Sequence, residues 1–240
     1  MRFRYALRAG IGLVCAFALP TVSAYDAGPV KNGGSIVGVV RYDGPPPPAA
    51  KLTITKDQDV CGNDATDEQL VIGADGALAN AVVSLSSVSR GKPFAEDAAV
   101  LDQKRCRYAP HVLLVPAGAP IKVVNDDGIL HNVHTYSRTN PPVNVAQPGF
   151  KKEITIELEE PESVPVKCDT HEWMSGVIVV MDHPYFAKTD DKGAFRLTDV
   201  PPGEYTLAAW HEKLAQKSAK VKVEADKESR VDFVLGSKAR

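Results

Sequence analysis

Short apolar or alternating segments, interrupted every few residues by Gly, Pro or Asp, make up most of this chain, and helical periodicity is scarce. Clear examples are SIVGVVRY at 35–42, ALANAVVSLSSV at 77–88, PIKVVN at 120–125, VIVVMD at 177–182 and EYTLAAW at 204–210. Segments of this length, rich in β-branched residues and bounded by turn formers, are typical of strands. The pattern therefore predicts an all-β protein of the sandwich type.

The N-terminus has a different character. Arg2, Arg4 and Arg8 come before a short apolar run, and Val22-Ser23-Ala24 ends it with small residues. This arrangement predicts a cleaved signal peptide over residues 1–24 and export to the periplasm. Because the run is too short to span a bilayer, we expect no membrane span in the mature form.

Charge and motifs exclude several function classes. Without residues 1–24 the chain keeps 25 Lys and Arg against 30 Asp and Glu, which offers no basic surface for nucleic acid. The sequence has no Gly-x-Ser-x-Gly nucleophile elbow, zinc-protease motif or phosphate-binding loop. Six histidines are also too few for a multicopper oxidase. We therefore expect the protein not to be an enzyme.

Three cysteines remain after cleavage, and an odd number leaves one of them unpaired. In an oxidising compartment we predict a disulfide between Cys61 and Cys106. The alternative is that Cys61 is only a small buried residue. With the pair formed, Cys168 is the free thiol.

The segment CDTHEWM, from Cys168 to Met174, places a thiol, an imidazole and a thioether within one short stretch. His131, in NDDGILHNVH after an apolar strand, supplies a second imidazole. One thiolate and two imidazoles in a plane with a weak axial thioether are the ligands of a blue-copper site. His131, Cys168, His171 and Met174 are therefore the predicted ligands of one copper ion.

The stretch RYAPHVLLVPAGAPIKVVNDDGILHNVH…KKEITIEL…CDTHEWMSGVIVVMD resembles the cupredoxins, and among them the amicyanins. The resemblance implies a Greek-key β-sandwich with one type 1 copper site that carries single electrons to and from a redox protein, a dehydrogenase or a cytochrome. It also implies that Asn125 ties the two ligand loops together by hydrogen bonds. Thr170 and Glu172 depart from the family, which usually has proline on either side of the second ligand histidine.

Apolar and acidic residues flank the predicted ligands, namely Ile129, Leu130, Glu172 and Trp173. They have two interpretations: core packing, or a docking surface around the edge of His171, through which the electron would pass to a partner. The other histidines, His111, His134, His183 and His211, are expected to be structural, although a second metal site involving His134, His183 or His211 stays open.

An early piece, GGSIVGVVRYDGPPPP…GALANAVVSL, and a late piece, TDDKGAFRLTDVPPGEYTLAAW, together resemble the carboxypeptidase regulatory-like, or transthyretin-like, β-sandwich family. We therefore expect a cupredoxin domain at 93–182, inserted into a discontinuous host sandwich made of 30–92 and 183–237. The alternative is two or three β-domains in tandem. The combination resembles methylamine-utilisation-type periplasmic proteins.

Two further functions remain open at this level. One is copper storage or delivery without redox cycling. The other is a structural or interaction module that binds no metal.

Overall fold

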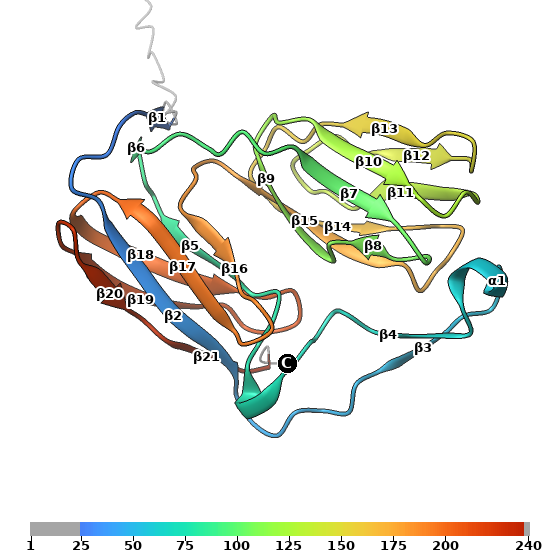
Figure 1. Ribbon diagram of the computed structural model, residues 1–240, viewed down its shortest axis with the longest axis horizontal. Coiled ribbons are helices and arrows are strands. Elements are labelled where there is room, and N and C mark those ends of the chain that lie inside the picture. Colours follow the sequence, from blue (N-terminus) through green and yellow to red (C-terminus); the bar gives the residue numbers. More distant parts are fainter. Residues whose placement is uncertain (1–24, 238–240) are drawn as a thin grey trace, which may run out of the picture.

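The computed structural model describes residues 25–237, so the predicted signal peptide lies outside the described residues. Two β-sandwiches lie side by side (Figure 1), and the prediction of an all-β protein is confirmed. Within the described part, helical structure is limited to α1 (Gln58–Cys61) and the short 3-10 turn η1 (Ala74–Gly76). No helix among residues 25–237 is long and apolar enough to cross a membrane.

The first sandwich combines strands from both ends of the described chain. One sheet has the order β16 (Phe186–Lys188), β5 (Val82–Ser86), β18 (Gly203–Trp210), β19 (Lys217–Val223). The facing sheet has the order β17 (Ala194–Val200), β2 (Gly34–Tyr42), β20 (Glu228–Arg230), and β21 (Phe233–Leu235) also pairs with β2. Alternate residues of β2, such as Ile36 and Val40, face the core, as the two-residue period of a strand requires. A small ribbon of β1 (Asp26–Ala27) and β6 (Arg90–Gly91) borders this sandwich.

The second sandwich is made of strands that are consecutive in the sequence. Its four-stranded sheet has the order β13 (Glu153–Ile156), β10 (Ile121–Asn125), β7 (Ala99–Gln103), β8 (Tyr108–Ala109). Its five-stranded sheet has the order β12 (Asn144–Gln147), β11 (His131–Thr135), β14 (Ser163–Lys167), β15 (Ser175–Met181), β9 (Val112–Pro116). None of these described strands pairs with a strand outside 93–182.

Strand β15 is apolar along its length because both of its faces are buried. Ile178 and Val180 point into the core of the second sandwich. Val177, Val179 and Met181 point the other way and join a separate cluster between the two sandwiches. A continuous apolar run in place of alternation is what a strand covered on both sides requires.

The contact between the sandwiches is mainly apolar, and Phe94, Phe186 and Trp210 complete its cluster. Polar groups close its edges. Nε2 of His111 lies 2.5 Å from a carboxylate oxygen of Glu212, and both side chains are largely buried. The two sandwiches are therefore held in a defined relative position.

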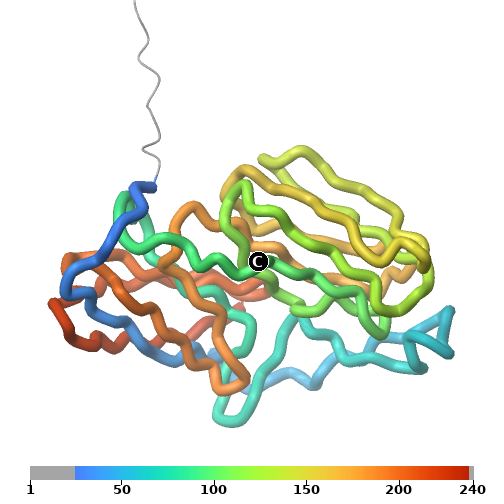
Figure 2. Tube along the Cα trace, turned by 45° about the horizontal axis from the view of Figure 1, so that its top comes forward, coloured from blue at the N-terminus to red at the C-terminus, as the bar shows by residue number. Residues whose placement is uncertain are grey.

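A long connecting segment leaves the first sandwich after β2 and runs to the far end of the second one (Figures 1 and 2). It contains β3 (Lys51–Thr53), α1 and β4 (Asp64–Thr66), and β3 pairs with β4. We call residues 51–66 the arm. Ile54 and Cys61 of the arm are buried against Cys106, to which Cys61 is disulfide-bonded with an S–S distance of 1.96 Å.

Candidate metal centre

Three of the predicted ligands converge at one end of the second sandwich. The Nδ1 atoms of His131 and His171 lie 3.0 Å apart, and Sγ of Cys168 lies 3.9 and 3.8 Å from them. All three side chains are buried, with exposed fractions of 0, 0 and 1 % for His131, His171 and Cys168. A thiol and two imidazoles that face one point form a donor set suited to copper.

The local fold explains how one short loop supplies several of these groups. Strands β14 and β15 are antiparallel, and Lys167 pairs with Ser175, so residues 168–174 close the hairpin. Inside the loop, the N–H of Cys168 donates to the carbonyl of Met174, and the N–H of Met174 donates to the carbonyl of His171. Met174 is fully buried in the same cluster as Cys168. His131 reaches the loop from the start of β11.

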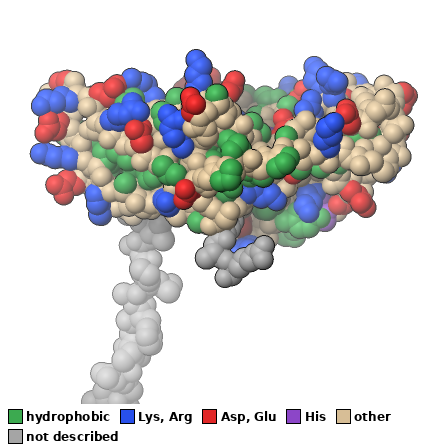
Figure 3. Space-filling view, turned by 90° about the horizontal axis from the view of Figure 1, so that it is seen from below, with side chains coloured by type: hydrophobic (Ala, Val, Ile, Leu, Met, Phe, Trp, Pro, Cys, Tyr) green, Lys and Arg blue, Asp and Glu red, His purple; other side chains and the backbone are tan. Residues whose placement is uncertain are grey.

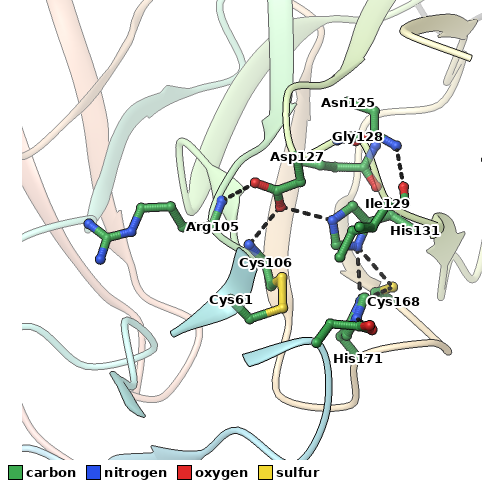
Figure 4. A network of polar contacts seen from close by, with 12 residues as sticks. Cys61, Arg105, Cys106, Asn125, Asp127, Gly128, Ile129, His131, Cys168 and His171 are labelled. Carbon is green, nitrogen blue, oxygen red and sulfur yellow. Dashed lines mark hydrogen bonds and ion pairs between the residues drawn. A yellow bond between two sulfur atoms is a disulfide. The ribbon is translucent and has the colours of Figure 1, made fainter. Parts of the chain in front are cut away.

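Each histidine is held on its outer nitrogen by a carboxylate. Nε2 of His131 lies 2.9 Å from Asp127, and Nε2 of His171 lies 2.9 Å from Asp57. Asp127 also accepts hydrogen bonds from the N–H groups of Arg105 and Cys106 (Figure 4). Ionised carboxylates only accept hydrogen bonds, so each Nε2 is the donor, and each Nδ1 faces the centre, where it carries a lone pair in the neutral ring and a proton in the charged one. Such outer carboxylate partners fix the orientation and tautomer of metal-ligating histidines.

The electrostatics of the centre favour a cation. Burial acts to lower the pKa of His131, but hydrogen bonds to Asp127 and Cys168 outweigh it and raise that pKa to about 9. Burial acts to raise the pKa of Cys168, yet hydrogen bonds from His131 and from backbone N–H groups lower it overall. Burial lowers the pKa of His171, against the hydrogen bond to Asp57. Two imidazole lone pairs and a thiolate facing one another repel unless a proton or a metal ion lies among them, so the residues present fit a soft metal such as copper.

The link between the two ligand loops differs from the expectation for Asn125. Its side chain donates to the carbonyls of Ile129 and Gln147 and accepts from the N–H of Gly128, which shapes the turn before His131. None of these bonds reaches residues 168–174. Asn132 makes that connection, because its side chain accepts from the N–H of Asp169 at 2.6 Å and donates to the Asp169 carboxylate at 3.0 Å.

The structure divides the four predicted docking residues. Ile129 and Trp173 pack against the cluster that contains Ile54, Cys61 and Cys106, which gives them a packing role beneath the arm. Leu130 is 48 % exposed and Glu172 is also exposed. The expected electron route through an exposed His171 edge does not match this geometry, because the arm covers that edge.

The remaining histidines lie apart from the centre, in agreement with structural roles. Nδ1 of His134 lies 3.0 Å from Asp169, and its ring stacks on Tyr136 at 4.4 Å. Nε2 of His183 donates to the carbonyl of Leu85, and His211 is buried. Within residues 25–237, none of these three belongs to a group of side chains placed to hold a metal ion.

Comparisons with known proteins agree with this architecture. The carboxypeptidase regulatory-like domain family matches residues 163–236. That match begins at the first residue of β14, before the host boundary expected at 183, although β14 and β15 hydrogen-bond within the second sandwich. Amicyanin from Paracoccus denitrificans is 29 % identical over 111 residues, which cover 45 % of this chain and 85 % of amicyanin.

Solved structures with local similarity include an amicyanin, a purple cupredoxin and a Cu-containing nitrite reductase. Amicyanin from Paracoccus versutus is 21 % identical, with a TM-score of 0.32, and the match covers 41 % of this chain and 97 % of that one. A purple cupredoxin from Nitrosopumilus maritimus is 20 % identical, with a TM-score of 0.30, and the match covers 35 % and 99 %. A Cu-containing nitrite reductase from Thermus scotoductus is 20 % identical, with a TM-score of 0.33. That match covers 40 % of this chain and only 25 % of the nitrite reductase.

Fold and centre thus define an all-β protein of two packed sandwiches with a buried Cys–His cluster at the end of one of them. Together with the family match and the amicyanin relative, they support a cupredoxin domain combined with a carboxypeptidase regulatory-like β-sandwich.

Proposed function

We propose that the protein is an exported, periplasmic type 1 copper protein that carries single electrons between redox partners and is not itself an enzyme. The observation that carries the proposal is the convergence of Cys168, His131 and His171, whose ligand atoms all lie within 4.8 Å of one another. We also propose that residues 93–182 form a cupredoxin domain inserted into the host sandwich of 30–92 and 183–237. The sheet memberships support this division.

Each ligand has a distinct role in this proposal. Cys168 would supply the thiolate, His131 and His171 would supply the two imidazoles, and Met174 would add the weak thioether that tunes the reduction potential. Copper held by such a set changes oxidation state with little rearrangement of its ligands. Buried side chains and outer hydrogen bonds keep the ligands in place through that change.

The charges on one face of the protein support a redox-protein partner more than a nucleic-acid partner. On the face shown in Figure 3, basic and acidic side chains are interspersed without a continuous area of one sign. Electron-transfer encounters between proteins use small, weak contacts, so they do not need a large charged patch. The donor and acceptor are proposed only as a class, a dehydrogenase or a cytochrome.

The test is an absorption spectrum of the mature protein loaded with Cu(II). We expect an intense thiolate-to-copper band near 600 nm that disappears in Cys168→Ser and in His131→Gln. His134→Gln is the matched control, since His134 lies on the same strand but outside the cluster, and its band should persist. A wild-type protein that binds copper without this band would contradict the type 1 assignment.

One observation favours a second function, copper storage or delivery. The arm leaves His171 with no exposed surface, and a closed site suits retention of a metal better than rapid exchange of electrons through that edge. This function predicts Cu(I) binding without an intense blue Cu(II) form, together with transfer of the metal to an acceptor.

A further inference from the structure

The arm is a separate element that contributes directly to the surroundings of the metal centre. It belongs to neither sandwich by strand pairing, since β3 and β4 pair with each other. Its contacts with the second sandwich include the buried Ile54, the disulfide from Cys61 to Cys106, and Asp57. These three contacts place the tip of the arm over the loop that contains His171.

Asp57 is held firmly at this tip. It precedes α1, and its carbonyl accepts hydrogen bonds from the N–H groups of Val60 and Cys61. Its backbone has φ of 50°, a left-handed conformation that Asp, Asn and Gly tolerate better than other residues. The disulfide lies at the end of the same helical turn, so it restrains Asp57 as well.

The carboxylate of Asp57 completes the enclosure of the His171 ring. Its oxygen lies 2.9 Å from Nε2, while Trp173 lies on another side with ring centroids 5.1 Å apart. The sulfur atoms of the disulfide lie within 4.8 Å of a nitrogen of His171. The Asp57 side chain is itself 45 % exposed, and the ring beneath is 0 % exposed. Asp57 thus lies between the buried His171 ring and solvent.

We propose that the arm is a fixed cap, in which Asp57 acts as a positioning residue that orients His171 and closes the edge of that ligand to solvent and to protein partners. The inference rests on the proposed copper site and adds to it a residue from outside the cupredoxin domain. As a consequence, electrons leave or enter through a different part of the surface. Metal also escapes slowly unless the arm moves.

Variants of Asp57 separate this role from folding. Asp57→Gly removes the carboxylate and keeps the left-handed backbone without strain, whereas Asp57→Asn keeps an oxygen that can accept from Nε2. Asp59→Ala is the matched control, because it removes a different carboxylate from the same helical turn. Among the described side-chain hydrogen bonds, the Asp59 carboxylate has none to His171. Both positions are at the surface of the arm, so the core stays intact.

Two measurements on the mature chain test the proposal. The first is the rate at which the Cu(I) chelator bicinchoninate removes copper from the loaded protein. Loss of an outer partner of a metal-bound histidine typically weakens metal binding by about 10- to 100-fold, and we expect removal to accelerate by that order in Asp57→Gly. Asp57→Asn and Asp59→Ala should stay close to wild type.

The second measurement uses metal-free, ¹⁵N-labelled protein and detects the Nε2–H proton of His171 by NMR, assigned by its loss in His171→Gln. The proton should be visible in wild type, in Asp57→Asn and in Asp59→Ala, because it is hydrogen-bonded and shielded. It should be lost to rapid exchange in Asp57→Gly.

The outcomes distinguish this inference from the proposed function. If wild type retains no copper, the copper function fails, and the NMR signal alone decides whether Asp57 caps His171. If the signal is the same in wild type and in Asp57→Gly, whether visible or absent in both, the cap is refuted. Equal rates of copper removal in Asp57→Gly and Asp59→Ala would also overturn it.

Discussion

Removal of the Cys61–Cys106 disulfide is expected to lower the free energy of unfolding by about 4 kcal/mol. The bond joins cysteines 45 residues apart. For a closed loop of that size, the chain-entropy model gives a loss of roughly 13 cal/mol/K in the unfolded state, or about 4 kcal/mol at 25 °C. This is a large share of the roughly 5–15 kcal/mol that a typical domain has.

Urea denaturation of wild type and of the Cys61→Ala/Cys106→Ala double variant measures this difference. Reduced wild-type protein is the matched control, because it keeps both buried sulfur atoms and loses only the cross-link. The double variant should be less stable than the reduced protein by a further roughly 1–2 kcal/mol, since truncation leaves space in the cluster around Ile54. The m-value should rise as the unfolded chain expands.

A change of less than about 1 kcal/mol between oxidised and reduced wild type would refute this reasoning. It would mean that the unfolded chain already keeps the arm close to residue 106, or that the arm unfolds separately from the sandwiches. Hydrogen exchange of the arm amides would then tell these explanations apart, because only the second predicts fast exchange limited to residues 51–66.

Three further predictions concern other parts of the molecule. Burial opposes ionisation of Glu162, but hydrogen bonds from residues 137–139 lower its pKa to about 2. The ionised side chain therefore contributes fully to the stability of the folded state above the ordinary pKa near 4.5. This contribution is lost as the pH falls towards 2. Glu162→Gln should therefore lower the free energy of unfolding by about 1 kcal/mol at pH 7 and by much less near pH 2, as measured by thermal unfolding. An equal loss of stability at both pH values would contradict this. Gly149→Ala should destabilise by at least about 2 kcal/mol in urea titrations, because its Cβ would lie 1.9 Å from the carbonyl oxygen of Gly128; a neutral effect would show that the loop has room to move. Asn132→Ala should cost about 2 kcal/mol and alter the Cu(II) absorption spectrum, since it breaks the link between the ligand loops; an unchanged spectrum would argue against that link.

Much of the fold follows from local pattern. The all-β class is visible in the short β-branched segments, and the run at 177–182 is a strand that is apolar because two cores cover it. The segment CDTHEWM places several predicted ligands within one short stretch, and the structure brings Cys168 and His171 together with the distant His131. Residue type and local spacing carry this information.

The arm and its contacts could not be predicted in this way. Residues 51–66 are mostly polar and too short in each segment to show a period, and Asp57 meets His171 across a separation of 114 residues. Asp127 had a weak local signal, because it lies four residues before His131 in a turn. The family resemblance assigned the link between the ligand loops to Asn125, so it gave no sign of Asn132. The pairing of β11 with β14 decides which side chain reaches Asp169, and that pairing is not visible in the local sequence.

The order of the strands along the chain has a consequence for the order in which the two sandwiches can fold during synthesis. The second sandwich has all its strands in one continuous stretch, so it can fold as soon as β15 has emerged. The first sandwich cannot, because β2 and β5 must wait for β17 and β18. We expect the second sandwich to serve as a template on which the first closes. Until then β2 and β5 keep unpaired edges, which is the stage at which the emerging chain most needs a chaperone.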